Sequence, residues 1–87
     1  MKVKAQLRAY DALAAHLRAA REEQEVTQTV LAQRLGRPQS YVAKYERGER
    51  QLDLIEYLLI TNALGIDDWV IARRVKQVLA RPGKALR

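Results

Sequence analysis

The sequence predicts an all-α protein: one compact domain of five helices. Three observations lead to this prediction. Apolar residues recur at three- and four-residue spacing in several segments, which is typical of amphipathic helices. Glycine, proline and capping residues separate these segments, and none of them alternates apolar and polar residues as a half-buried strand does. A chain of 87 residues, 48% of them hydrophobic, has material for a single small core.

The first helix is expected from Asp11 to Gln24. Its apolar residues recur at helical spacing, at Leu13, Leu17 and Ala20, with Leu7 and Tyr10 extending the stripe toward the N-terminus. The residues before Tyr10 are basic, and the pattern leaves open whether they continue this helix or form a loose arm.

The second helix is expected from Gln28 to Leu35, because Thr27 is a good N-cap and Gly36 can adopt the left-handed conformation that ends a helix. The third is expected from about Gln39 to Glu46, with Pro38 at its start and Gly48 as its stop. Helical geometry divides its side chains into two groups: Tyr41, Val42 and Tyr45 on one side, and Gln39, Ser40, Ala43 and Lys44 on the other.

The fourth helix is expected to follow the cap Asp53 and to run through Leu64, and the fifth to follow Asp67 and reach about Ala80. The fourth is apolar nearly all round, whereas one core-facing stripe needs about half of its apolar residues. Either all of them fill the core of one chain, or part of the surplus forms a two-fold interface between copies. We hypothesise the second, with these interface residues: Ile55, Leu59, Trp69 and Val70.

The net charge of +6 and the pI of about 10.1 favour a polyanionic partner. Basic residues concentrate in residues 1–10, 34–50 and 73–87, whereas residues 11–33 and 51–72 are net acidic. We therefore expect a basic N-terminal extension of residues 1–9, a main domain of residues 10–80 and a basic tail of residues 81–87. A solvated surface with a frayed end is the alternative explanation for the tail.

Several classes of protein are not expected. The chain has no cysteine, which excludes disulfides and thiolate chemistry. No segment resembles a signal peptide or a membrane span, so we expect a cytoplasmic protein. His16 is the only histidine and is expected to be a packing or surface residue of the first helix. Metal-ligand spacings and phosphate-binding loops are missing, so we expect no metal, no cofactor and no enzymatic activity.

The segment "VTQTVLAQRLGRPQSYVAKYERGE" resembles the Cro and phage-repressor type of helix-turn-helix, the XRE-like family. Gln28, Ala32, Gly36 and Val42 match its polar start, small residue, turn glycine and buried aliphatic. The following "LDLIEYLLITNALGIDDW" is similar to the family's fourth helix and the start of its fifth, so the resemblance covers about Tyr10 to Trp69. Pro38 departs from the pattern, which usually has serine or threonine at that N-cap.

The resemblance implies that the third helix enters the DNA major groove. The residues at base-contacting positions are Gln39, Ser40 and Lys44. Glutamine can pair with adenine through two hydrogen bonds, serine suits either base type, and lysine reaches guanine acceptors or a phosphate. The residues expected at the phosphates are Thr27, Gln28, Arg37, Tyr41, Arg47 and Arg50. Arg21 and Glu46 hold family positions that form a salt bridge, which would aim the third helix.

Three functions remain open at this point. The first is a sequence-specific regulator of transcription that binds double-stranded DNA as a homodimer on a palindromic operator. It would need no small-molecule effector, and it could act by contacting RNA polymerase. The second is an antitoxin that binds a toxin protein, although residues 81–87 offer only Leu86 as an apolar anchor. The third is an RNA-binding module, which leaves the helix-turn-helix spacing unexplained.

Overall fold

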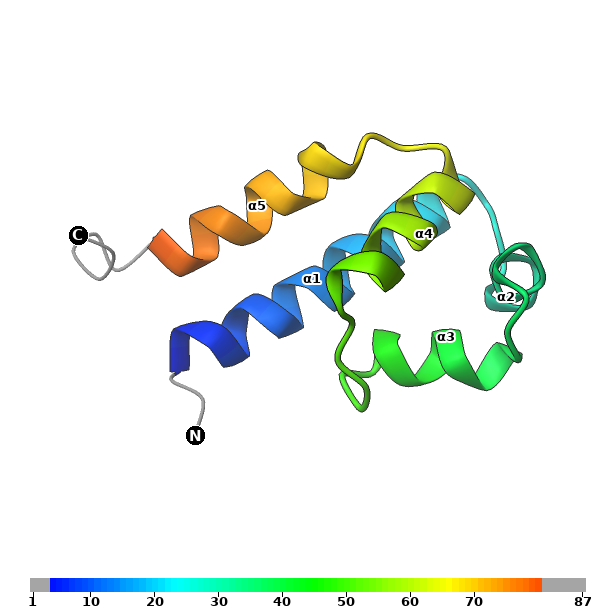
Figure 1. The fold of residues 1–87 in the computed structure, drawn as a ribbon, viewed down its shortest axis with the longest axis horizontal. Helices are drawn as coiled ribbons and strands as arrows, with labels where there is room; N and C mark the ends of the chain where they lie inside the picture. Colours follow the sequence, from blue (N-terminus) through cyan, green and yellow to red (C-terminus); the bar gives the residue numbers. More distant parts are fainter. Residues whose placement is uncertain (1–3, 81–87) are drawn as a thin grey trace.

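The computed structural model describes residues 4–80, apart from the side chain of Ala5, and these residues form five helices without a strand (Figure 1). The helices are α1 (Lys4–Glu23), α2 (Gln28–Leu35), α3 (Gln39–Glu46), α4 (Leu54–Leu64) and α5 (Asp68–Ala80). The all-α prediction is therefore confirmed. The basic tail predicted for residues 81–87 lies outside the described residues, as does the "RPG" expected to end α5.

The predicted start of the first helix is wrong, because α1 begins at Lys4 rather than Asp11. The basic residues that precede Tyr10 continue the helix, which settles the question the sequence left open. Lysine, alanine, glutamine, leucine and arginine all favour helices, and Ala9 is buried. The boundary expected between an extension and a domain at residue 10 thus falls inside a helix.

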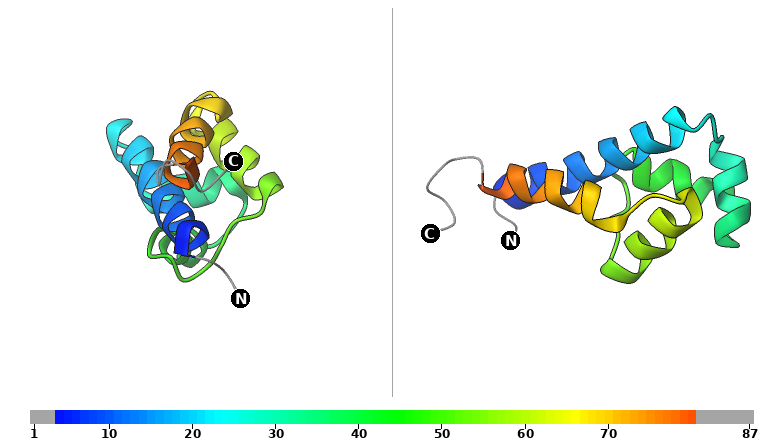
Figure 2. Two further views of the ribbon diagram at one scale, coloured as in Figure 1. Left: turned by 90° about the vertical axis from the view of Figure 1, so that its left-hand side faces the viewer. Right: turned by 90° about the horizontal axis from the view of Figure 1, so that it is seen from above.

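All five helices contribute to one core. Each supplies at least one side chain with no more than 2% of its surface exposed, namely Leu17, Leu31, Val42, Ile60 and Ile71. α1 and α5 lie side by side and antiparallel, while α2 and α3 stand at the other end of the molecule (Figures 1 and 2). None of the helices among residues 4–80 combines the length and the hydropathy that crossing a membrane requires.

The N-termini of the inner helices are capped in different ways. Thr27 caps α2 by accepting a hydrogen bond from the Val30 amide, at 3.1 Å. Asp53 and Glu56 form a reciprocal capping box at the start of α4. Pro38 occupies the N-cap of α3 and provides no side-chain cap there.

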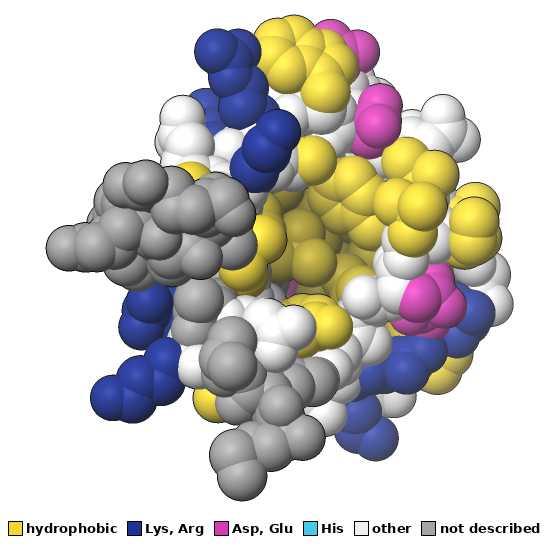
Figure 3. Space-filling view, turned by 60° about the vertical axis from the view of Figure 1, so that its left-hand side comes forward, with side chains coloured by type: hydrophobic (Ala, Val, Ile, Leu, Met, Phe, Trp, Pro, Cys, Tyr) yellow, Lys and Arg dark blue, Asp and Glu magenta, His cyan; other side chains and the backbone are white. Residues whose placement is uncertain are grey.

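α4 carries apolar side chains on its outer face as well as on its inner face. The large hydrophobic residues exposed on α4 are Leu54, Ile55, Leu58 and Leu59, which we call the outer face of α4. Trp69, at the start of α5, is also exposed. Figure 3 shows hydrophobic side chains gathered in a hollow, with Lys and Arg side chains around part of its rim. An apolar hollow between α1, α4 and α5 has Leu13, Leu54, Tyr57 and Val75 in its lining, so it shares only Leu54 with the outer face of α4.

A candidate nucleic-acid interface

The turn between α2 and α3 fixes the angle at which α3 leaves the core. Gly36 adopts a left-handed conformation with φ of 68°, which an L side chain rarely adopts. The amide of Arg37 donates to the Ala32 carbonyl at 3.0 Å and closes the end of α2. Because Ala32 is small and buried, the two helices approach closely.

Two side chains of α3, Val42 and Tyr45, pack into the hydrophobic core and are almost completely buried. Ala43 is buried as well, so its predicted place on the polar side is wrong. The reason is that α3 packs against both α1 and α2, and a short helix in such a corner buries more than one stripe. Gln39, Ser40 and Lys44 remain exposed and form the outward side of α3, which we call the exposed face of α3.

A chain of hydrogen bonds connects this face to the core. Gln39 Nε2 donates to Gln28 Oε1 at 2.6 Å, and Gln28 Nε2 donates to Glu46 Oε1 at 2.9 Å. Arg21 donates to both oxygens of Glu46, through Nε at 2.7 Å and Nη2 at 3.0 Å. Its Nη1 donates to the Val26 carbonyl at 2.8 Å, so all three nitrogens of the guanidinium are bound, to two different groups. The exposed Gln39 is thereby tied to a buried ion pair.

The structure brings Arg21 and Glu46 together deep below the surface, with side chains only 9% and 2% exposed. The hydrogen bonds that Arg21 donates to Glu46 raise the pKa of its guanidinium, although burial opposes this. The Arg21 guanidinium is therefore charged at neutral pH. A buried pair of this kind does not by itself show a large stabilisation, but removal of either partner leaves an uncompensated charge.

Three arginines surround α3, and the structure gives each a different neighbour. Arg47, at the C-terminal end of α3, pairs with Glu49 at 2.8 Å, and both side chains are more than half exposed. Their contact raises the pKa of Arg47 and lowers that of Glu49. Arg37 lies over the ring of Tyr41, 4.7 Å from its centroid. Arg50 lies over the same ring at 5.2 Å and forms an ion pair with Glu56.

The other residues expected at phosphates differ in exposure. Thr27 is exposed, with its hydroxyl engaged in the cap of α2, and Gln28 is half-buried. Tyr41 is buried, and this burial is the main cause that raises the pKa of its hydroxyl, with the Glu56 carboxylate adding to it. Its ring thus serves mainly as a platform for the two arginines.

The residues expected at a two-fold interface do not all lie on one surface. Ile55, Leu59 and Trp69 are exposed by 63%, 53% and 55%. Val70 is half-buried and lines a hollow on α1 together with His16. In residues 4–80 no group of three His, Asp or Glu side chains is arranged to hold a metal ion.

Sequence reasoning missed two features of this region. The first is Glu56, which accepts from the Asp53 amide at 3.0 Å and also binds Arg50. The spacing of Asp53 and Glu56 is that of a capping box and was a usable signal. The second is the bond between Gln28 and Gln39, for which the sequence offers no signal because it depends on the angle between two helices.

The chain was compared with known proteins. A model of a helix-turn-helix domain family matches residues 12–73. A solved XRE-family like protein from Pseudomonas syringae pv. tomato str. DC3000 is similar at 40% identity and a TM-score of 0.75, over 79% of this chain and 84% of that one. The restriction–modification controller protein C.AhdI from Aeromonas hydrophila is similar at 31% identity and a TM-score of 0.67, over 71% and 94%.

A third solved structure, the clp gene regulator ClgR from C. glutamicum, shares 25% identity at a TM-score of 0.71, over 91% of this chain and 96% of that one. A search of curated proteins gives no match. The family model covers most of the chain, and its helix-turn-helix is the segment whose geometry is described above. The chain therefore belongs to the XRE-like family of helix-turn-helix proteins and is a DNA-binding regulator of transcription.

Proposed function

We propose that the protein binds a palindromic operator as a homodimer, with α3 of each copy in the major groove. The exposed face of α3 carries this proposal, because polar side chains able to read bases lie on a helix that the core holds rigidly. An α-helix fits the major groove, and each base pair presents a distinct pattern of donors and acceptors there. In this arrangement Gln39, Ser40 and Lys44 contact bases.

The geometry of Gln39 supports its role. A side-chain amide has two N–H donors and one carbonyl acceptor. One donor binds Gln28, which leaves one N–H and the carbonyl, the pair that adenine N7 and N6 require. Because Gln28 is itself bound to Glu46, the amide is oriented before DNA arrives. Less side-chain entropy is then lost on binding.

The residues around α3 are suited to the DNA backbone. We propose phosphate contacts from Thr27, Gln28, Arg37, Arg47 and Arg50, with the Tyr41 ring supporting two of the arginines. The exposed pair of Arg47 and Glu49 is weakly held, so a phosphate can replace the carboxylate at little cost. Such contacts fix the position of the protein and carry no sequence information.

The outer face of α4, together with Trp69, is the proposed two-fold interface. Its side chains are between 36% and 68% exposed, which is unusual for five large hydrophobic residues gathered on one side of a monomer. A second copy covers this surface and places two α3 helices about one turn of DNA apart, roughly 34–36 Å. Val70 lies at its margin because it also faces α1.

Selection of bound duplexes from a random pool tests the proposal. A palindromic consensus with half-sites about one helical turn apart is the expected result. A consensus without symmetry would remove the dimer from the proposal and leave sequence recognition intact. If no sequence is enriched over the starting pool, sequence-specific binding is wrong, and an antitoxin that binds a protein through the outer face of α4 becomes the better explanation.

A further inference from the structure

We propose that Glu56 is a positioning residue for DNA binding, which holds the guanidinium of Arg50 where a backbone phosphate can meet it. The inference rests on the proposed function and adds a residue of α4 to a surface otherwise built from α2, α3 and the loop after α3. Glu56 need not touch DNA, because it acts through Arg50.

Both oxygens of the Glu56 carboxylate are used inside the protein. Oε1 accepts from the Asp53 amide at 3.0 Å, while the Glu56 amide donates to Asp53 Oδ1 at 2.7 Å. Oε2 accepts from Arg50 Nη2. The side chain of Glu56 is 11% exposed and that of Arg50 is 42% exposed. The carboxylate is therefore an inner, fixed group, and the guanidinium is the outer group of the pair.

A second contact fixes the plane of the Arg50 guanidinium. It lies over the Tyr41 ring at 5.2 Å from the centroid, and the guanidinium of Arg37 lies over the same ring at 4.7 Å. In residues 4–80 no carboxylate pairs with Arg37. Two guanidinium groups thus contact the buried Tyr41 ring, and only the one of Arg50 pairs with a carboxylate. The excess positive charge favours binding of a phosphate.

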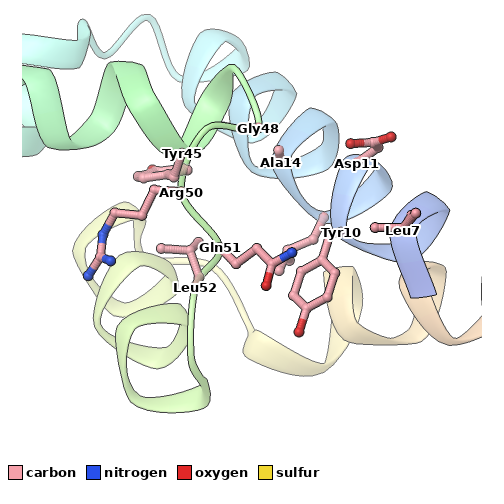
Figure 4. Close-up of a pocket in the computed structure, with 10 residues that line it drawn as sticks. Leu7, Tyr10, Asp11, Ala14, Tyr45, Gly48, Arg50, Gln51 and Leu52 are labelled. Carbon is pink, nitrogen blue, oxygen red and sulfur yellow. The ribbon is translucent and has the colours of Figure 1, made fainter. Parts of the chain in front are cut away.

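The direction of Arg50 agrees with this role. Arg50 lines the same hollow as Tyr10 and Gln51, but in Figure 4 its guanidinium extends to the side opposite these two residues, where Glu56 of α4 accepts from it. Arginine has five N–H donors in a planar fork, and the contact with Glu56 uses only Nη2. The remaining donors are available to a phosphate while the ion pair stays intact, so Glu56 orients Arg50 without competing for all of it.

Four variants test the inference: Glu56→Gln, Glu56→Asp, Arg50→Ala and the double variant Glu56→Gln with Arg50→Ala. Asp53→Asn is the matched control, because it removes a nearby carboxylate but keeps a good N-cap and leaves Arg50 and Glu56 together. Affinity for the selected operator and for a scrambled duplex is measured across a range of salt concentrations, at a temperature where thermal unfolding shows every variant folded.

Arg50→Ala is expected to weaken binding to both duplexes about tenfold and to lower the salt slope by about one charge per protomer. Glu56→Gln is expected to weaken both about threefold to tenfold, and to have no further effect when Arg50 is already alanine. Glu56→Asp keeps the charge but is too short to reach both partners, so it is expected to behave like Glu56→Gln. Asp53→Asn is expected to leave affinity and slope unchanged.

Other outcomes overturn the inference in distinguishable ways. Equal losses from Glu56→Gln with and without Arg50 assign Glu56 a structural role only. Tighter binding by Glu56→Gln shows that the carboxylate competes with DNA. If Arg50→Ala changes nothing while Arg47→Ala flattens the salt dependence, the proposed function stands and the role of Arg50 and Glu56 fails. If the unaltered protein binds no DNA, the proposed function fails and the inference fails with it.

Discussion

The exposed face of α3 and the outer face of α4 are both accessible to solvent but are built in opposite ways. On α3 the exposed Gln39 is connected by hydrogen bonds through Gln28 to the buried pair of Glu46 and Arg21. On the outer face of α4 the exposed side chains are apolar, and nothing in residues 4–80 covers them. Hydrogen bonds therefore order the first surface within a single chain, whereas the proposed partner copy would be needed to remove the second surface from water.

Removal of Arg21 tests the first half of this comparison and has the largest expected effect. In Arg21→Ala the Glu46 carboxylate, 2% exposed, loses its counter-charge. Loss of one partner of a buried pair costs about 3–5 kcal/mol, which lowers Tm by about 15 °C or more in a domain of this size. DNA binding is expected to weaken by more than tenfold even where the variant is folded, because the anchor of Gln28 and Gln39 is gone. Calorimetry and operator titration provide the two measurements.

Arg18→Ala is the matched control, because Arg18 pairs with Glu22 on the outside of α1, with both side chains more than half exposed. An exposed pair contributes at most about 1 kcal/mol, so little change in Tm is expected. If Arg21→Ala is as mild as Arg18→Ala, or if it keeps full operator affinity while folded, the rigidity ascribed to the α3 surface is wrong.

Charging the outer face of α4 tests the second half. Ile55→Glu with Leu59→Glu removes two exposed apolar side chains from the proposed interface. Burying each such side chain stabilises a complex by up to about 1.5–3 kcal/mol, so the dimer dissociation constant is expected to rise by at least a hundredfold. Sedimentation should show a folded monomer. The fraction of operator that this monomer binds should fall steeply as the protein concentration is lowered.

Val70→Glu sharpens this second test. Val70 is half-buried against α1 rather than exposed beside Leu59. Val70→Glu is therefore expected to lower Tm, and to raise the dimer dissociation constant less than the double change on α4 does. A dimer that survives the double change on α4 but dissociates with Val70→Glu would move the two-fold axis to the side of α5 that faces α1.

The salt dependence of DNA affinity distinguishes residues that contact bases from residues that contact phosphates. Gln39→Ala is expected to narrow the gap between operator and scrambled DNA by about 1–3 kcal/mol, with little change in salt slope. Arg47→Ala is expected to weaken both duplexes by similar factors and to flatten the slope by about one charge per protomer. Titration of both variants on both duplexes across salt decides the matter. Loss of discrimination in Arg47→Ala, with full discrimination in Gln39→Ala, reverses the roles.

The smallest expected effect concerns Tyr45, the anchor beneath α3. Its hydroxyl is buried and has no hydrogen-bond partner among residues 4–80. Tyr45→Phe removes an unsatisfied group and is expected to stabilise the protein by about 1 kcal/mol at pH 7. Thermal unfolding measures this, and a loss of stability would mean that the hydroxyl is satisfied in solution.

The same variant has a pH signature. Burial strongly raises the pKa of Tyr45 in the folded state, whereas tyrosine in the unfolded chain ionises near pH 10. Ionisation of Tyr45 therefore leaves stability unchanged below about pH 10, and it destabilises the folded state progressively as the pH rises from there toward the folded-state pKa. Denaturant unfolding should therefore show that Tyr45→Phe loses less stability than the unaltered protein above pH 10, although Tyr41 and Tyr57, whose pKa values are also raised, remain in both.

The sequence predicts the helices well wherever caps and glycines mark them. Thr27, Gly36, Asp53 and Gly65 define α2 and α4 to the residue. The start of α1 has no such mark, because no capping residue or glycine precedes it, and residues with high helix propensity continue the helix back to Lys4. Apolar periodicity alone therefore placed that boundary wrongly.

The sequence could predict which polar residues of α3 are exposed, but not the hydrogen bonds and ion pairs that the candidate site residues make. The resemblance supplied Gln39, Lys44 and the position of the salt bridge, because motif spacing determines which side of α3 faces outward. The burial of Ala43 and the attachment of Arg50 to Glu56 depend on how neighbouring elements cross, which is a tertiary property.

The pairing of α1 with α5 also has a consequence for the folding reaction. These two helices are separated in sequence by the other three, so their contact closes a loop that spans most of the described chain. Non-local contacts of this kind slow folding, whereas neighbouring helices such as α2 and α3 meet early. We expect α2, α3 and α4 to form the folding nucleus and α5 to dock last. The C-terminal end of α5 and the N-terminal end of α1 lie at the same end of the molecule in Figure 1. A circular permutant that joins these two ends should keep the native structure and fold faster than the natural chain order.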